Sequence, residues 1–288
     1  MKVLVTGGTG FLGKPLVKRL QERGHLVKVL SRNQGKLIDM KGIEIFSGDV
    51  SIYSDVYEAM QDVQGVYHLA ASKHVGLAER LVTECVRSNV VGSYNVYECS
   101  REFKPEFVMS ISTDKACQVA GIYGATKLLM EGMSQQYQTI NPETKYRMVR
   151  YGNVLYSTGS VLCKWKDAIL NGEDIVVTEP EATRFFWTVE QALDLIDEGL
   201  KQDSPTPYVP EMKGMSIENL LIAMCRKYGG DKYVLEGGFD GKSDTLFSDK
   251  VKIIGLQPGE NMHERILENG PNSNEVTQFT VDEIMELI

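Results

Sequence analysis

Short apolar runs alternate with segments of helix length through the first 150 residues, and this rhythm limits the folds that the chain can adopt. Six runs have the β-branched, nearly continuous apolar character of buried strands: VLVTG, HLVKVLS, IEIFSGD, GVYHLAA, FVMSIST and YRMVRYG. Strands that alternate with helices form a parallel sheet covered on both faces, and the crossovers between them are right-handed. We therefore predict an α/β fold built on a Rossmann-type doubly wound parallel sheet.

A glycine-rich segment lies between the first predicted strand and the first predicted helix. Gly8, Gly10 and Gly13 have the spacing G-x-G-x-x-G, with VLVT before them and KPLVKRLQERG after them. Side chains here would keep a pyrophosphate away from the helix N-terminus, where backbone N–H groups and the helix dipole attract negative charge. The context predicts a dinucleotide site, and a glycine-rich turn without a ligand is the alternative. The predicted contacts in this segment are Gly7, Thr9, Gly10, Phe11, Leu12 and Gly13.

The end of the second strand distinguishes between dinucleotides. An Asp or Glu here would bond the ribose 2′-hydroxyl of NAD, but the chain has Ser31 and Arg32, with Lys36 close behind. A hydroxyl and a guanidinium suit a 2′-phosphate, which predicts NADP, and an ordinary surface arginine is the alternative. The next two strands end in a carboxylate placed for the adenine amino group and in small residues that leave room for the cofactor. These further predicted contacts are Asp49, Val50, Leu69 and Ala70.

Composition argues against several classes of partner. The formal net charge of −8 disfavours nucleic acid and anionic membranes, which are held by clustered Lys and Arg. No apolar stretch is long enough to span a bilayer, and no export signal precedes the first strand. The five cysteines are scattered without C-x-x-C spacing, which suits a reducing compartment. We expect a cytoplasmic protein, and no metal, because the histidines lack metal-ligand spacing.

A second group of polar residues follows the fifth strand. Tyr123 and Lys127 are four residues apart at the start of a predicted helix, so they share one face. A nearby ammonium lowers the pKa of a tyrosine hydroxyl and lets it act as a base near neutral pH. Just upstream, residues 112–115 (STDK) end the fifth strand at the sheet edge where open α/β sheets bind ligands. A surface ion pair or a helix cap is the alternative role for Asp114 and Lys115.

These motifs resemble those of the UDP-N-acetylglucosamine 4,6-dehydratases of the polysaccharide-biosynthesis type, within the extended short-chain dehydrogenases/reductases. The matching stretches span nearly the whole chain: TGGTGFLG, AASKHVGLAE, SNVVGSYNV, STDKA, YGATK, VRYGNVLYSTGSV, ATRFFWT and GLQPGENMHE. STDKA followed by YGATK is the most specific pair. The resemblance implies conversion of UDP-N-acetylglucosamine, or a close UDP-sugar, to a 4-keto-6-deoxy sugar. It also implies inversion at C5 and internal hydride transfer through bound NADP.

The resemblance assigns a role to each polar group. Tyr123 takes the proton of the sugar 4-hydroxyl, oriented by Lys127 and Thr113, while Asp114 is the acid at the C6 hydroxyl and Lys115 the base at C5. The base needs a lowered pKa and the acid a raised one. The implied cofactor contacts include Lys73, Asn89, Tyr123 and Lys127, and the implied substrate contacts are Lys73, Asn153, Thr178 and Arg184.

We predict two parts in the chain. Residues 1–152 form the NADP-binding Rossmann domain, and residues 153–288 form mainly a substrate-binding lobe, with some segments returning to the core. The resemblance implies a homo-oligomer, a dimer or larger, with helices near 80–100 and 124–138 supplying the interface.

Two departures from the family pattern leave other functions open. Thr158 and Gln257 stand where the family usually has Arg, so two cations that could meet a pyrophosphate are missing. The UDP-sugar is therefore less firmly predicted than the dehydration. A UDP-sugar 4-epimerase or reductase needs no acid and base at C5 and C6, so the adjacent Asp114 and Lys115 argue against it. A non-catalytic NADP-binding regulator tends to lose the catalytic tyrosine or lysine, and both are present.

Overall fold

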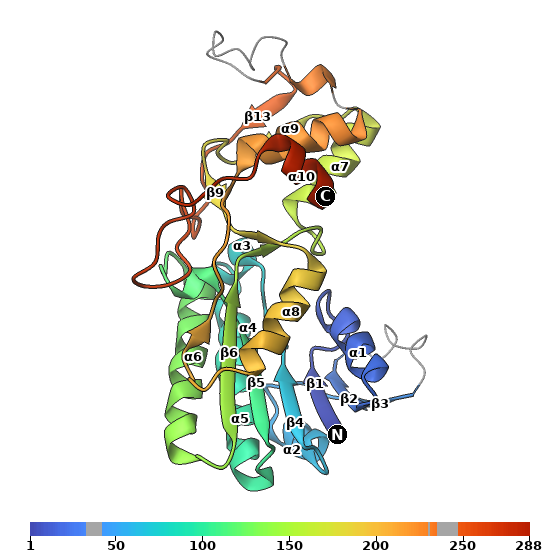
Figure 1. The fold of residues 1–288 in the computed structure, drawn as a ribbon, viewed down its shortest axis with the longest axis vertical. Coiled ribbons are helices and arrows are strands. Elements are labelled where there is room, and N and C mark those ends of the chain that lie inside the picture. The colour runs from blue at the N-terminus through green and yellow to red at the C-terminus, as the bar shows by residue number, and fades with distance from the viewer. Residues whose placement is uncertain (33–41, 230, 235–246) are drawn as a thin grey trace.

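The computed structural model places the six predicted strands side by side in one parallel sheet (Figure 1). It describes residues 1–32, 42–229, 231–234 and 247–288, so Lys36 lies outside the described residues. In chain order the strands of this sheet are β1 (Lys2–Thr6), β2 (Leu26–Ser31), β3 (Ile43–Ser47), β4 (Gly65–His68), β5 (Phe107–Thr113), β6 (Lys145–Tyr151) and β11 (Pro207–Tyr208). Their order across the sheet is β11-β6-β5-β4-β1-β2-β3, which confirms the predicted doubly wound arrangement.

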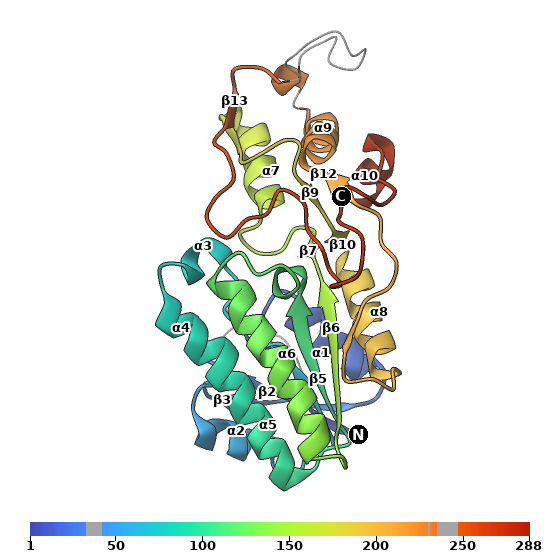
Figure 2. The same ribbon diagram turned by 90° about the vertical axis from the view of Figure 1, so that its left-hand side faces the viewer.

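Helices cover both faces of this sheet (Figures 1 and 2). On one face lie α1 (Gly13–Glu22) and α8 (Val189–Leu200), and on the other lie α2 (Tyr53–Met60), α5 (Gly92–Phe103) and α6 (Ile122–Ile140). One apolar core lies between the sheet and the two helices α1 and α8. A second lies between the sheet and the helices α2, α5 and α6. Burial of these apolar faces holds the three layers together.

Helix α1 illustrates how the sequence produces this packing. Leu16, Val17 and Leu20 recur at helical spacing, and all three are buried in the first core. On another side of the same helix, Arg19 Nη1 donates to Asp194 Oδ1 on α8 at 2.7 Å. Helix α8, although it follows residue 152, therefore belongs to the Rossmann layers.

Apart from α8 and β11, the segments after residue 152 mainly form a smaller lobe above the carboxyl edge of the sheet (Figure 1). Its elements are β7 (Asn153–Val154), α7 (Val161–Asn171), β8 (Ile175–Val177), β9 (Thr183–Arg184), β10 (Phe186–Trp187), β12 (Met215–Ser216), α9 (Ile217–Tyr228), β13 (Val251–Ile253) and α10 (Val281–Leu287). The lobe has an apolar core of its own. None of the helices in the described ranges is long and apolar enough to cross a membrane.

Candidate active site

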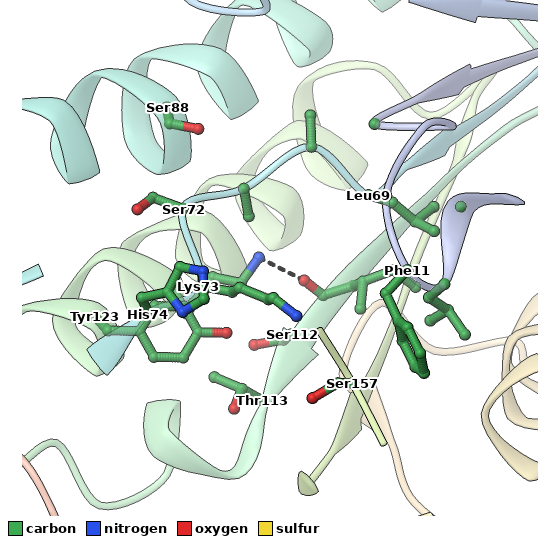
Figure 3. Close-up of a pocket in the computed structure, with 18 of the residues that line it drawn as sticks. Phe11, Leu69, Ser72, Lys73, His74, Ser88, Ser112, Thr113, Tyr123 and Ser157 are labelled. Atoms are coloured by element: carbon green, nitrogen blue, oxygen red, sulfur yellow. Dashed lines mark hydrogen bonds between the residues drawn. The ribbon is translucent and has the colours of Figure 1, made fainter. Parts of the chain in front are cut away.

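A cavity of about 700 Å³ opens at the carboxyl edge of the sheet, where the strand order reverses between β1 and β4. Figure 3 shows Lys73, Thr113, Tyr123 and Ser157, which come from separate segments, around the same space. The predicted site residues that line the cavity are Gly7, Thr9, Gly10, Phe11, Leu12, Gly13, Ser31, Arg32, Asp49, Val50, Leu69, Ala70, Lys73, Thr113, Asp114, Lys115, Tyr123, Lys127 and Asn153. The fold thus brings most of the predicted residues to one place.

The glycine-rich turn meets two different requirements. Gly7 has φ +72°, and a Cβ on Gly13 would lie 2.3 Å from the carbonyl oxygen of Gly7, so the turn itself needs both glycines. Among the described residues, a Cβ on Gly10 would meet only the Gly7 carbonyl oxygen, at 3.1 Å. Because Gly10 lines the cavity just before α1, its missing side chain leaves room for a ligand. This arrangement fits a pyrophosphate at the N-terminus of α1.

The end of β2 carries the predicted 2′-phosphate contacts. Thr9 Oγ1 and Ser31 Oγ are hydrogen-bonded at 2.7 Å, and Arg32 Nη1 lies 3.9 Å from Asp49 Oδ2. Asp49 is held in place because its Oδ1 accepts a hydrogen bond from the backbone N–H of Ser51 at 2.9 Å. A hydroxyl, a guanidinium and a carboxylate therefore stand together at one end of the cavity, where they suit the adenosine part of a dinucleotide.

Tyr123 and Lys127 lie on the first turns of α6. The helix starts at Ile122, whose backbone N–H donates to Glu79 Oε1 at 2.6 Å. Lys127 Nζ donates to the carbonyl oxygen of Ile111 at 2.6 Å, and burial lowers its pKa to about 8. The expected lowering of the Tyr123 pKa is not found. Burial disfavours the phenolate and raises the pKa of Tyr123 to about 12.

Asp114, which is buried, and Lys115, whose side chain is 13% exposed, form an acid–base pair at the end of β5. Asp114 Oδ1 accepts from Thr113 Oγ1 at 2.9 Å and from Lys115 Nζ at 3.2 Å, whereas its Oδ2 is buried with no hydrogen-bond partner in the described part of the chain. Burial raises the pKa of Asp114, as the acid role predicts. For Lys115 the prediction of a lowered pKa is wrong. Burial alone would lower it, but the carboxylates of Asp114 and Glu264 outweigh burial and raise the pKa.

Glu264 was not among the predicted site residues. It is buried and accepts a hydrogen bond from Lys115 Nζ at 2.9 Å. The only signal in the sequence is its place at the end of GLQPGENMHE, one of the stretches that carry the family resemblance. Spacing could not have linked it to Lys115, because the two residues are 149 positions apart.

The structure places Asn89 beside the cavity wall instead of on it. The residue is buried in a π-helical turn, Arg87–Val91, and is not among those that line the cavity. Its Oδ1 accepts from the backbone N–H of Ser72 at 2.7 Å, and its Nδ2 donates to Thr126 Oγ1 at 3.0 Å. Asn89 thus holds the backbone just before Lys73, and a contact between Asn89 and the cofactor stays a prediction.

Only some of the predicted substrate residues line the cavity. Lys73 and Asn153 line the cavity, and burial lowers the pKa of Lys73. Thr178 and Arg184 do not line it. Arg184 is buried in the lobe, where its Nη1 donates to the carbonyl oxygen of Met262 at 3.0 Å. A contact between these two residues and a substrate stays a prediction.

Comparison with known proteins adds the family context. A family model described as polysaccharide biosynthesis protein matches residues 3–286. The chain is 31% identical to the UDP-N-acetylglucosamine 4,6-dehydratase (inverting) of Campylobacter jejuni, over 91% of this chain and 76% of that protein. It is 29% identical to the UDP-glucose 4-epimerase of Rickettsia bellii, over 92% and 77%. The solved structure of Pen from Bacillus thuringiensis is 26% identical and has a TM-score of 0.87, covering 100% of this chain and 96% of that one.

Proposed function

The chain belongs to the polysaccharide biosynthesis protein family, and on that premise we propose that it is a nucleotide-sugar 4,6-dehydratase. Its substrate is UDP-N-acetylglucosamine or a close UDP-sugar, and its product is a 4-keto-6-deoxy sugar with C5 inverted. The proposal rests above all on the pair of Asp114, which is buried, and Lys115, which is largely buried, beside Tyr123. A dehydratase needs an acid and a base at C6 and C5 in addition to the base at the 4-hydroxyl.

We propose NADP as the cofactor. The turn around Gly10 has room for its pyrophosphate, and Ser31 and Arg32 would hold its 2′-phosphate. Bound NADP supplies a reversible hydride acceptor, which serves C4 first and C6 afterwards. Tyr123, Lys127 and Lys73 line the same cavity as the dinucleotide turn, so the nicotinamide would meet the sugar beside them.

The side chains then divide the proton transfers between them. Tyr123 accepts the proton of the 4-hydroxyl, and a positively charged nicotinamide nearby would favour the phenolate that burial disfavours. Asp114 keeps its proton because it is buried, and Oδ2 is the oxygen free of protein partners in the described part of the chain. That oxygen donates to the C6 hydroxyl, which leaves as water. Lys115 removes the C5 proton from one face of the ring, and inversion requires the returning proton to reach C5 from the opposite face.

A 4-epimerase is the second candidate, because one relative carries that name at 29% identity. An epimerase would use Tyr123, Lys127 and Thr113 in the same way. It has no use for a buried acid and amine directly after β5, so Asp114 and Lys115 favour dehydration.

The experiment is incubation with UDP-N-acetylglucosamine and NADP in deuterated water, followed by mass spectrometry and NMR. We expect loss of one water, one deuteron at C5 and a 4-keto-6-deoxy sugar of inverted C5 configuration. Lys115→Ala should abolish the product, whereas Lys104→Ala, which removes an exposed lysine paired with Glu143, should not. A product with the mass of the substrate would establish the epimerase instead.

We propose further that the enzyme is a cytoplasmic homo-oligomer. The five cysteines carry free thiols, in keeping with a reducing compartment. In Figure 2, α4 (Val82–Val86) leads through the π-helical turn into α5, and α6 lies beside them. Several large apolar side chains on and beside these helices are exposed: Leu81, Val82, Val86, Tyr94, Leu128 and Leu129. A second copy of the chain would remove this surface from water.

A further inference from the structure

Glu264 is a carboxylate without solvent exposure, placed against the acid–base pair from the C-terminal lobe. Its Oε1 accepts from Lys115 Nζ at 2.9 Å and lies 3.7 Å from Arg184 Nε. Its Oε2 accepts from Asn261 Nδ2 at 3.3 Å. An unpaired carboxylate at such a depth is costly, so Glu264 depends on these partners. Among them only Lys115 belongs to the proposed reaction.

The Rossmann core holds the segment that carries Glu264. Arg150 on β6 is buried, and its Nη1 donates to the carbonyl oxygen of Ile266 at 2.9 Å. Its Nη2 donates to Glu131 Oε2 on α6 at 2.6 Å, and this buried ion pair keeps the guanidinium in place. The backbone N–H of Glu264 donates to Ser273 Oγ at 2.9 Å. Glu264 is therefore fixed relative to β5 and Lys115 although it comes from a late segment.

Of the charged groups that face Lys115 in the described ranges, one can accept its proton. They are Asp114, Glu264 and Arg184. A base at C5 must be a neutral amine, yet the charge of Glu264 favours the ammonium even when Asp114 carries its proton. Asp114 has to keep its own proton to serve as the acid, and Arg184 accepts none. Within the described ranges, Glu264 is thus the remaining group in hydrogen-bond contact that can take the proton from Nζ.

We propose that Glu264 is a positioning residue that aims the Lys115 amine at C5 and accepts its proton before the elimination, an inference that rests on the proposed function. The Nζ–H bond breaks and an O–H bond forms on Glu264 Oε1, which leaves a neutral amine and a neutral carboxyl group. The amine takes the C5 proton, Asp114 protonates the C6 hydroxyl, and water leaves.

The cycle closes with water as the only further proton donor and acceptor. After the hydride reaches C6, C5 takes a proton from water on the face opposite Lys115, which inverts C5. Lys115 gives its proton to water, and the proton held by Glu264 goes back to Nζ. Asp114 regains the proton that Tyr123 took from the 4-hydroxyl, by way of the Thr113 hydroxyl, which bonds Asp114 Oδ1 at 2.9 Å. All three side chains end as they began.

The test compares Glu264→Gln with wild type in single turnovers of UDP-N-acetylglucosamine in deuterated water. Absorbance of the reduced nicotinamide reports oxidation at C4, and mass spectrometry reports deuterium at C5. We expect C4 oxidation to stay within about twofold and C5 exchange to fall about 10- to 100-fold, the effect of losing one hydrogen bond to a charged group. Glu268→Gln is the matched control, since Glu268 is exposed and pairs with Arg150 instead of Lys115.

A second readout needs no substrate. The pKa of Lys115 Nζ, followed by ¹⁵N NMR of labelled lysine and assigned with Lys115→Ala, should fall in Glu264→Gln, because one of two facing carboxylates loses its charge while Asp114 and Arg184 remain. An unchanged pKa together with wild-type C5 exchange would overturn the inference. Failure of the wild type to oxidise the sugar while the Lys115 pKa still falls in the variant would reject the proposed substrate alone. If Glu264→Gln fails to bind NADP, Glu264→Asp takes its place with the same expected split.

Discussion

Arg32 stands at the adenosine end of the cavity with 69% of its side chain exposed and a carboxylate of Asp49 at 3.9 Å. The NADP assignment depends on its guanidinium more than on any other group, because a 2′-phosphate is the one feature that NADP has and NAD lacks. An exposed cation contributes less than a buried one, so the expected effect is at the lower end of charge-assisted hydrogen bonds.

We expect Arg32→Ala to weaken NADP binding about tenfold and to leave NAD binding unchanged, since charge-assisted contacts to one phosphate are lost. Fluorescence titration with both dinucleotides measures the ratio. Arg101→Ala, which removes an exposed arginine paired with Glu98 on α5, should alter neither affinity. Equal weakening of both dinucleotides would show that Arg32 does not select the 2′-phosphate.

Lys115 shows which properties of the site can be predicted from the sequence and which cannot. The run STDK and its distance from Tyr123 were enough to predict that Asp114 and Lys115 lie in one site, because both follow a strand that ends at the ligand-binding edge. The raised pKa of Asp114, which the acid role predicts, is caused chiefly by burial, to which the charge of Glu264 adds. The direction in which the pKa of Lys115 shifts could not be predicted, because it depends on Glu264, which lies near Lys115 only in the folded chain.

At the scale of elements, His68 at the end of β4 ties three of them together. Thr6 Oγ1 on β1 hydrogen-bonds its Nδ1 at 2.8 Å, and Ser93 Oγ on α5 hydrogen-bonds its Nε2 at 2.9 Å. The ring is buried, and desolvation, with some help from Lys127, lowers its pKa from 6.5 to about 3. Between pH 3 and pH 6.5, His68 therefore binds a proton in the unfolded chain but stays neutral in the folded chain.

Stability should consequently fall as the pH drops below 6.5 towards 3. We expect His68 to account for about 2 kcal/mol of the free energy of unfolding lost by pH 5. Urea unfolding of wild type and His68→Gln at pH 7 and pH 5 measures this contribution. The variant should lose about 2 kcal/mol less of its free energy of unfolding between the two pH values than wild type does. His74→Asn, at an exposed histidine, should keep the wild-type pH dependence, and a His68→Gln that also keeps it would contradict the assignment.

The helices and strands differ in how well the sequence predicts them. The strands β1 to β6 could be predicted because burial on both faces demands nearly continuous apolar runs. The two-residue strand β11, Pro207–Tyr208, is too short to leave a pattern, and it joins the sheet only by pairing with β6. The π-helical turn around Asn89 likewise has no spacing signal, so the hydrogen bond from the backbone N–H of Ser72 to Asn89 could not be predicted.

At the scale of the whole molecule, the exposed apolar surface on α4 and α6 is the proposed contact between copies. Leu129 on α6 is 57% exposed there. We expect Leu129→Glu to shift the protein from an oligomer to a monomer in light scattering coupled to gel filtration, because a charge buried between copies is costly. Leu170→Glu, on α7 of the lobe, should leave the oligomer intact. A wild-type monomer, or a variant that still associates, would reject this surface.

Residues of both Rossmann cores line the cavity, to which the segment after residue 152 adds Asn153, Val154 and Ser157, and the proposed chemistry needs both parts of the chain. Dinucleotide, tyrosine and acid belong to the first part, whereas Glu264 belongs to the second. This division explains why the first 152 residues could be assigned from strand rhythm and glycine spacing, while the contribution of the lobe depends on contacts between distant segments.

The most direct test of the central claim follows one hydrogen. UDP-N-acetylglucosamine deuterated at C4 is mixed with unlabelled substrate and turned over by the enzyme with NADP, and the products are analysed by mass spectrometry and NMR. Dehydration through bound NADP requires the deuterium to appear at C6 of a 4-keto-6-deoxy sugar, within the molecule that carried it at C4. Deuterium that stays at C4 of a product with the mass of the substrate would contradict the account and identify an epimerase.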